Sequence, residues 1–126
     1  MPIDPTLPYD DQNIFAKILR GEIPCSKVHE DDHVLAFRDI NPQAPTHVLV
    51  IPKAPFVSWD DFSVRGTDEQ IAAFVRGVGE VARMLGLVEP GYRLLANIGI
   101  DAHQEVPHLH VHLFAGRKLG PMLTNG

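Results

Sequence analysis

The sequence predicts a single α+β domain in which an antiparallel sheet packs beside helices. Its length of 126 residues corresponds to one ordinary domain, and its content of 44% hydrophobic and 21% charged residues is typical of globular proteins. Segments with helical periodicity stand before and between groups of segments typical of strands. This order favours an antiparallel sheet of about five strands with two helices, and a mixed sheet with one crossover connection is the alternative.

The first elements are a short helix and three strands. The helix is predicted over residues 13–20, because its apolar residues recur on one face and Gly21 follows its end. These apolar residues are Ile14, Phe15, Ile18 and Leu19. Strands are expected over residues 26–30, 33–40 and 46–53, with a tight turn between the first two and a Pro-containing loop before the third.

A long helix should follow, starting at Thr67, because Gln70 stands three residues later in the pattern of a capping box. The residues expected to face the core are Ile71, Phe74, Val75, Val78, Ala82 and Leu85. Gly86 is the expected C-cap, and Gly77 and Gly79 indicate close packing because glycine is costly within a helix. Residues 54–66 carry mixed signals and are expected to be irregular. The last two strands are predicted over residues 92–99 and 109–115.

Composition excludes several classes of protein. The net charge of −5 argues against a nucleic-acid partner, because no cluster of Lys and Arg offsets it. Cys25 is the only cysteine, which favours a reducing cytoplasm. We expect neither a signal peptide nor a membrane span, because the first residues lack a basic and apolar pattern and no apolar run is long enough. Residues 1–11 and 119–126 are expected to be flexible tails around a domain at 12–118.

The most informative segment is PHLHVHLFAG, residues 107–116. Because side chains alternate between the faces of a strand, His108, His110 and His112 are predicted to share one face. The apolar residues between them, such as Leu109 and Val111, can then face the core. The segment would therefore present a row of imidazoles roughly 7 Å apart.

Three interpretations of this row remain open at the level of residue types. It could be a polar strand face without a function, or it could bind Zn²⁺ with an open coordination position. The third is metal-free nucleophilic or acid–base catalysis, since imidazole titrates near neutral pH. The third is favoured, because a hairpin would bring Asn97 to one end of the row and the loop at residues 102–106 could direct its N–H groups at an anion.

With these residues the sequence resembles the histidine triad family of nucleotide hydrolases and transferases. The family motif alternates histidine with apolar residues and reads His108-Leu-His110-Val-His112-Leu-Phe here. The segment INPQAPTHVLVIPK, residues 40–53, is similar to the Hint branch of the family. The resemblance covers residues 12–118 and implies a sheet of about five strands that continues into the sheet of a second subunit.

The resemblance also implies residue roles. His110 would be the nucleophile that attacks phosphorus, His112 would lie near the leaving group, and His108 and His47 would support them. Asp39 would accept hydrogen bonds from ribose, and Asn97 would lie beside the phosphate. The purine would lie in an apolar slot made by Ile14, Phe15, Ile18, Phe37 and Ile40. His103, Gln104 and Glu105 complete the expected nucleotide-binding residues.

The function so implied is hydrolysis of purine nucleoside phosphoramidates through a nucleotidyl-histidine, with no metal or other cofactor. The alternatives are a dinucleoside polyphosphate hydrolase and a nucleotide-binding regulatory protein. Many relatives carry Ser or Thr at the position of Glu105. We therefore expect the contacts to the leaving group to differ here, and the natural leaving group stays open. A zinc-binding CxxC of some relatives falls on Asn13 and Ala16, so we expect no zinc. A homodimer is expected through the long helix, where Gly77 and Gly79 allow close approach, and residues 92–97.

Overall fold

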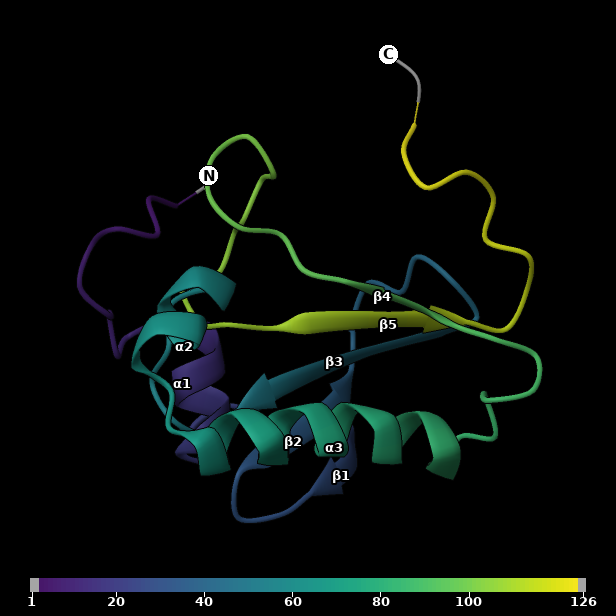
Figure 1. The fold of residues 1–126 in the computed structure, drawn as a ribbon, viewed down its shortest axis with the longest axis horizontal. Helices are drawn as coiled ribbons and strands as arrows, with labels where there is room; N and C mark the ends of the chain where they lie inside the picture. Colours follow the sequence, from purple (N-terminus) through teal and green to yellow (C-terminus); the bar gives the residue numbers. More distant parts are fainter. Residues whose placement is uncertain (1–2, 125–126) are drawn as a thin grey trace.

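The computed structural model describes residues 3–124, which form one five-stranded sheet flanked by helices (Figure 1). The helices are α1 (Ile14–Leu19), α2 (Trp59–Arg65) and α3 (Asp68–Met84). The strands are β1 (Lys27–Glu30), β2 (Val34–Arg38), β3 (Thr46–Pro52), β4 (Arg93–Leu95) and β5 (Val111–Ala115). The predicted α+β class is confirmed.

The strands follow the order β1-β2-β3-β5-β4, and every pairing among the described residues is antiparallel. The alternative of a mixed sheet is therefore wrong. The last strand lies between β3 and β4, and its His112 stands opposite Leu49 of β3. This register places His112 on the strand next to the edge strand β4.

The two C-terminal strands are shorter than predicted. The ladder of β5 starts at Val111, because the amide of Leu109 donates to the carbonyl of Phe56 outside the sheet, at 2.8 Å. His108 and His110 thus precede the paired part of the strand. The ladder of β4 spans Arg93–Leu95 within the predicted range of 92–99.

The segment expected to be irregular contains α2. Ser58 caps this helix, since its hydroxyl accepts a hydrogen bond from the amide of Asp61 at 3.3 Å. Asp61 also pairs with Arg65 one turn later, at 2.6 Å, and Phe62 points into the core. A serine followed by two acidic residues was the available signal for this helix start.

The long helix begins as predicted, with a complete capping box between Thr67 and Gln70. It ends at Met84, and Gly86 follows with a φ of 71°, a conformation that glycine adopts without strain. Gly77 packs closely on the sheet, because a Cβ there would lie 3.0 Å from Val34 Cγ2. The prediction that Val75 faces the core is wrong: its side chain is 58% exposed, and Val81 is buried instead.

The sheet has a covered apolar layer on each face. On one face, α3 packs against β2 and β3 (Figure 1). The side chains in this layer include Val34, Val48, Val50, Phe74, Val78, Val81, Val111 and Leu113. The other face carries a smaller cluster of Phe15, Leu35, Phe37, Leu49 and Ile51. Strand alternation separates these two sets, and the second face is the one on which the histidines lie.

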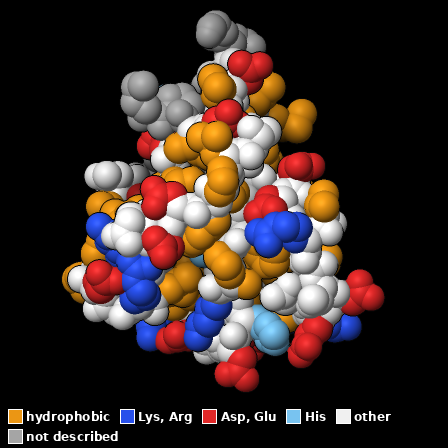
Figure 2. Space-filling view, turned by 90° about the vertical axis from the view of Figure 1, so that its left-hand side faces the viewer, with side chains coloured by type: hydrophobic (Ala, Val, Ile, Leu, Met, Phe, Trp, Pro, Cys, Tyr) orange, Lys and Arg blue, Asp and Glu red, His pale blue; other side chains and the backbone are white. Residues whose placement is uncertain are grey.

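The surface and the chain ends add two observations. Acidic and basic side chains are interspersed, with hydrophobic ones between them, on the face that Figure 2 shows. None of the helices in residues 3–124 has the length and apolar character that crossing a membrane requires. The expected flexibility of the tails and the cytoplasmic location remain predictions, and residues 1–2 and 125–126 lie outside the described residues.

Candidate active site

A cavity of about 250 Å³ opens on the histidine face of the sheet. Its walls are Phe15, Asp39, Gln43, Leu49, Asn97, His103, Glu105, Val106, His110 and His112. A larger cavity of about 660 Å³ lies on the other face, between α3 and β4, and no histidine or carboxylate lines it. The smaller cavity is therefore the candidate active site, since it brings two histidines of the motif together with two carboxylates.

His108 stands behind this cavity and is completely buried. Its Nε2 lies 2.8 Å from the carbonyl oxygen of Pro52, which only accepts, so Nε2 carries the proton. Burial lowers the pKa of His108 to about 4, so the ring is neutral near pH 7 and Nδ1 is an acceptor. The hydroxyl of Tyr9 donates to this Nδ1 at 2.6 Å.

His110 lines the cavity and has one nitrogen committed to the backbone. Its Nδ1 lies 2.7 Å from the carbonyl oxygen of His108, so Nδ1 is the donor and Nε2 carries the lone pair. Burial lowers the pKa of His110, which keeps this lone pair free of a proton near neutral pH. The ring of Phe15 packs edge-on against the imidazole, with 5.0 Å between ring centroids. His110 thus offers a fixed, neutral nitrogen nucleophile.

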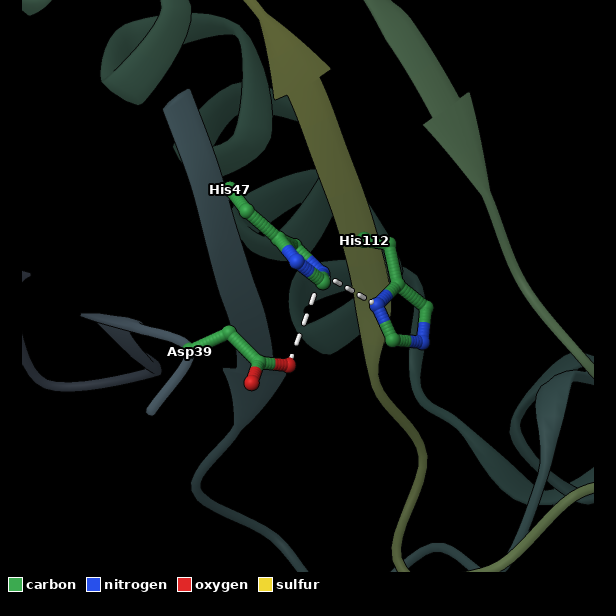
Figure 3. Close-up of side chains that lie close together, drawn as sticks. All are labelled: Asp39, His47 and His112. Carbon is green, nitrogen blue, oxygen red and sulfur yellow. Dashed lines mark hydrogen bonds and ion pairs between the residues drawn. The ribbon is translucent and has the colours of Figure 1, made fainter. Parts of the chain in front are cut away.

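His112 faces the same cavity with a hydrogen-bond donor, whereas His110 offers a lone pair. The amide of Gln43 donates to Nδ1 of His47 at 3.1 Å, so His47 carries its proton on Nε2. That Nε2 lies 2.9 Å from Nδ1 of His112 and donates to it (Figure 3). Burial lowers the pKa of His112 to about 4, so the ring is neutral and its remaining proton is on Nε2. His112 is therefore a hydrogen-bond donor.

Asp39, directly after β2, contacts His47 and so extends the row of contacting side chains that starts at His112. Its Oδ2 lies 3.5 Å from Nε2 of His47 (Figure 3). Its Oδ1 accepts a hydrogen bond from the amide of Asn41 at 2.8 Å. Burial lowers the pKa of His47, while the charge of Asp39 acts in the opposite direction. The carboxylate therefore orients His47 and still has an oxygen on the cavity.

The same three side chains could in principle hold a metal ion, because their ligand atoms lie within 4.8 Å of one another. Zinc would need about 2.0–2.1 Å to each nitrogen. His47 and His112 are instead joined directly by their hydrogen bond of 2.9 Å. A metal would have to break this bond and displace the Nε2 proton of His47, which keeps Nδ1 of His112 an acceptor. The geometry therefore fits a hydrogen-bonded pair better than metal ligation.

Comparison with known proteins assigns the family. A model of the HIT domain matches residues 20–119. The chain belongs to the HIT domain family. A 13.2 kDa HIT-like protein of Azospirillum brasilense is 67% identical over 118 residues, which cover 94% of this chain and 97% of the relative. The purine nucleoside phosphoramidase of Escherichia coli K12 is 44% identical over 115 residues, covering 91% and 96% of the two chains.

A solved structure confirms the fold of this HIT protein. The HIT family hydrolase from Clostridium thermocellum matches with a TM-score of 0.82 and 37% identity, over 91% of this chain and 99% of that one. The predicted resemblance to the histidine triad family, and the HIT-type fold that it implied, are confirmed.

The residues expected to hold a purine in the HIT protein fall into three groups. Phe15 lines the cavity, together with Leu49 and Val106, which were not predicted. Phe37 is buried behind Phe15, with ring centroids 5.5 Å apart, and the half-buried Ile18 packs against the same cluster. The side chains of Ile14 and Ile40 are exposed outside the cavity, Ile40 by 88%.

The loop before β5 supplies the rim of the cavity. His103 and Glu105 pair at 2.8 Å, and the Glu105 side chain is 63% exposed, so its carboxylate is turned towards solvent. His103 has a φ of 61°, which turns the backbone sharply at this point. The side chain of Gln104 lies outside the cavity, because its amide bonds the backbone of Gly99, Val57 and Val106. Gln104 therefore holds the loop together.

Besides Leu49 and Val106, two contributors that act through hydrogen bonds were missed. Gln43 acts through its backbone N–H, and the signal was its place four residues before His47 in the NPQAP loop. Tyr9 reaches His108 from a segment that is 99 residues away in sequence. No local pattern connects these two residues, so only the tertiary structure reveals the contact.

Proposed function

We propose that this HIT protein is a hydrolase that cleaves the phosphorus–nitrogen bond of purine nucleoside 5'-phosphoramidates. The observation that carries the proposal is the arrangement of protons at the triad. His110 Nδ1 donates to a carbonyl, so its Nε2 is a free nucleophile, and His112 faces the same cavity with Nε2–H. The name of the Escherichia coli relative, purine nucleoside phosphoramidase, supports the choice of substrate class.

In the first step, Nε2 of His110 attacks the phosphorus atom and the phosphorus–nitrogen bond breaks. The electron pair of the broken bond remains on the leaving amine, which takes a proton from water, while the Nε2–H of His112 donates a hydrogen bond to the reacting phosphate. The nucleotidyl-His110 keeps its Nδ1 proton on the carbonyl of His108, so the developing positive charge is matched by a hydrogen-bond acceptor.

In the second step, water attacks the phosphorus atom of the nucleotidyl-histidine. Its hydroxyl group becomes part of the nucleoside monophosphate, the bond to His110 breaks, and the released proton neutralises the hydroxide left by the first step. His110 is regenerated, and His112 keeps its proton throughout. The side chains supply the nucleophile and a hydrogen-bond donor, so the mechanism uses no metal and no other cofactor.

The cavity walls suggest how the nucleotide is held. Asp39 offers an acceptor for ribose hydroxyls, and Asn97 lies across the cavity as a donor for the phosphate. The aromatic ring of Phe15 provides the apolar wall for a purine beside His110. The exposed Ile14 and Ile40 would contact the base only at the edge of this slot.

We also propose that the protein is a homodimer that uses the larger cavity. Its walls include exposed apolar side chains of α3 and β4, among them Val75 and Leu94. Such a contiguous apolar surface is typical of an interface. Gly79 lines it, whereas Gly77 is already packed against Val34 of its own sheet. Of the two glycines expected at the dimer contact, only Gly79 is therefore available to it.

A turnover panel tests the proposed function. Adenosine 5'-phosphoramidate, diadenosine polyphosphates and aminoacyl-adenylates are offered to the wild-type protein, with and without a chelator. We expect the phosphoramidate to be cleaved fastest and at the same rate in chelator. Faster cleavage of a diadenosine polyphosphate would favour that alternative. Binding of AMP without turnover of any substrate would favour a regulatory protein.

A further inference from the structure

The segment before α1 makes a contact that the mechanism above does not use. Tyr9 lies outside the part of the chain that the HIT domain model matches, which begins at residue 20. Its hydroxyl nevertheless donates to Nδ1 of His108 at 2.6 Å. The two rings meet edge to face, with centroids 5.6 Å apart and an interplanar angle of 69°. We propose that Tyr9 is a positioning residue for His110, acting through His108, and this inference rests on the proposed function.

The first argument is that the side chain of His108 adds two fixed contacts to a backbone with little support from the sheet. His108 precedes Val111, where the ladder of β5 begins, and the backbone bond beside it runs from the Leu109 amide to the Phe56 carbonyl at 2.8 Å. Pro107 directly before it has no N–H to donate. The imidazole is instead held at both nitrogens, by the Pro52 carbonyl at 2.8 Å and by Tyr9.

The second argument is that the backbone of His108 orients the nucleophile. Its carbonyl oxygen accepts the Nδ1 proton of His110 at 2.7 Å, which fixes the direction of the His110 lone pair. A rotation of residue 108 would therefore misdirect Nε2 of His110. Reactions of held groups are sensitive to such small displacements. The Tyr9 hydroxyl is thus connected to the reacting nitrogen by two consecutive hydrogen bonds.

The third argument is that Tyr9 itself is held in place from both sides. Upstream, the amide of Ile3 donates to the Gln104 carbonyl at 2.8 Å, in the loop that forms the cavity rim. Downstream, the carbonyl of Asp10 accepts the side-chain amide of Asn13, the N-cap of α1, at 2.7 Å. The segment therefore connects the rim, the triad and the first helix. This arrangement is typical of a positioning element.

Substitution of Tyr9 by Phe removes the hydroxyl and keeps the ring, so the edge-to-face packing is retained. We expect kcat for adenosine 5'-phosphoramidate to fall about tenfold, the usual effect of losing one buried hydrogen bond. KM and the AMP dissociation constant should change less than about twofold. The matched control is Thr6→Val, which removes the hydroxyl of an exposed residue in the same segment and should leave kcat unchanged.

A purely structural role predicts a different result. If Tyr9 only anchors the segment, Tyr9→Phe would lower the thermal midpoint and leave kcat within about twofold of wild type. That result would overturn the inference, as would an equal fall of kcat in Thr6→Val.

A second measurement works even if no phosphoramidate is cleaved. In the wild-type protein with 15N-labelled histidine, the hydrogen bond shifts the unprotonated Nδ1 of His108 upfield. We expect this signal to move downfield in Tyr9→Phe, and the Nδ1 proton of His110 to exchange faster with water. Unchanged signals would refute the positioning role. A changed spectrum without turnover by the wild type would refute only the proposed function.

Discussion

Two cavities of this protein lie on opposite faces of one sheet and differ in nearly every property. The histidine cavity has about 250 Å³ and is lined by imidazoles, two carboxylates and two amides. The other has about 660 Å³ and is almost entirely apolar. Neighbouring residues of β5 contribute to both, since Val111 faces the apolar cavity and His112 the polar one. Because side chains alternate along β5, this one strand contributes to the candidate active site on one face and to the candidate dimer interface on the other.

This difference shows why volume alone is a poor guide to the active site. The larger cavity offers contact area but no titratable histidine or carboxylate. The smaller one has a nucleophile whose other nitrogen is fixed by a carbonyl at 2.7 Å. If the separation is real, substitutions in one cavity should leave the function of the other intact.

The largest effect is expected for His110→Ala. Loss of the nucleophile should reduce kcat by about 10³-fold or more, because no other free imidazole nitrogen lone pair faces the phosphorus. AMP binding should be retained, since Phe15 and Asp39 still line the cavity. Steady-state kinetics and calorimetric titration with AMP measure the two quantities. Retention of most of the wild-type rate would contradict the assigned role of His110.

The apolar cavity should control association instead. Leu94→Asp places a charge on a half-exposed position of β4, and we expect the dimer dissociation constant to rise about 30-fold or more. Sedimentation velocity over a concentration series measures it. Val64→Asp is the matched control, because Val64 is exposed on α2 and does not line this cavity. A wild-type protein that is monomeric at micromolar concentration would contradict the proposed interface.

The buried histidines should make the fold acid-sensitive. The pKa values of His108 and His112 are lowered from 6.5 to about 4, so the folded protein stays unprotonated where the unfolded chain already binds protons. The free energy of unfolding should therefore fall as the pH drops from 6.5 towards 4, by up to about 1.4 kcal/mol per pH unit for each histidine. Above pH 6.5 these two histidines should not make the free energy of unfolding depend on pH.

Urea denaturation from about pH 7 to about pH 4.5 tests this linkage. His108→Gln should flatten the acid slope, whereas the more exposed control His33→Gln should preserve it. An equal slope in both variants would show that other groups govern the acid sensitivity.

The smallest effect is expected at the rim, for Glu105→Gln. The Glu105 carboxylate is 63% exposed and pairs with His103, and such surface pairs contribute little. Turnover of phosphoramidates with neutral-amine and with lysine-type leaving groups should change by similar factors, each below about fivefold. The ratio of the two kcat/KM values decides the question. A selective loss for the cationic leaving group would place Glu105 inward, against the leaving group.

Much of the architecture was predictable because it follows from patterns of a few neighbouring residues. The period of two at His108, His110 and His112 predicted their common face, and the capping box at Thr67 predicted the start of α3. The start of α2 was also encoded locally, at Ser58 and the acidic residues after it, although mixed hydrophobicity obscured it. Backbone preferences act over a few residues, so the sequence alone determines such features.

The chemistry of the site depended on contacts between distant parts of the chain. Which nitrogen of His108 carries the proton follows from Pro52 and Tyr9, and neither lies near it in sequence. The side chain of Gln104 was expected at the nucleotide, but backbone partners on three segments hold it outside the cavity. The sequence thus determined that imidazoles stand in a row. Only the tertiary structure decided which nitrogen of each ring carries the proton, because burial and hydrogen-bond partners set the proton positions.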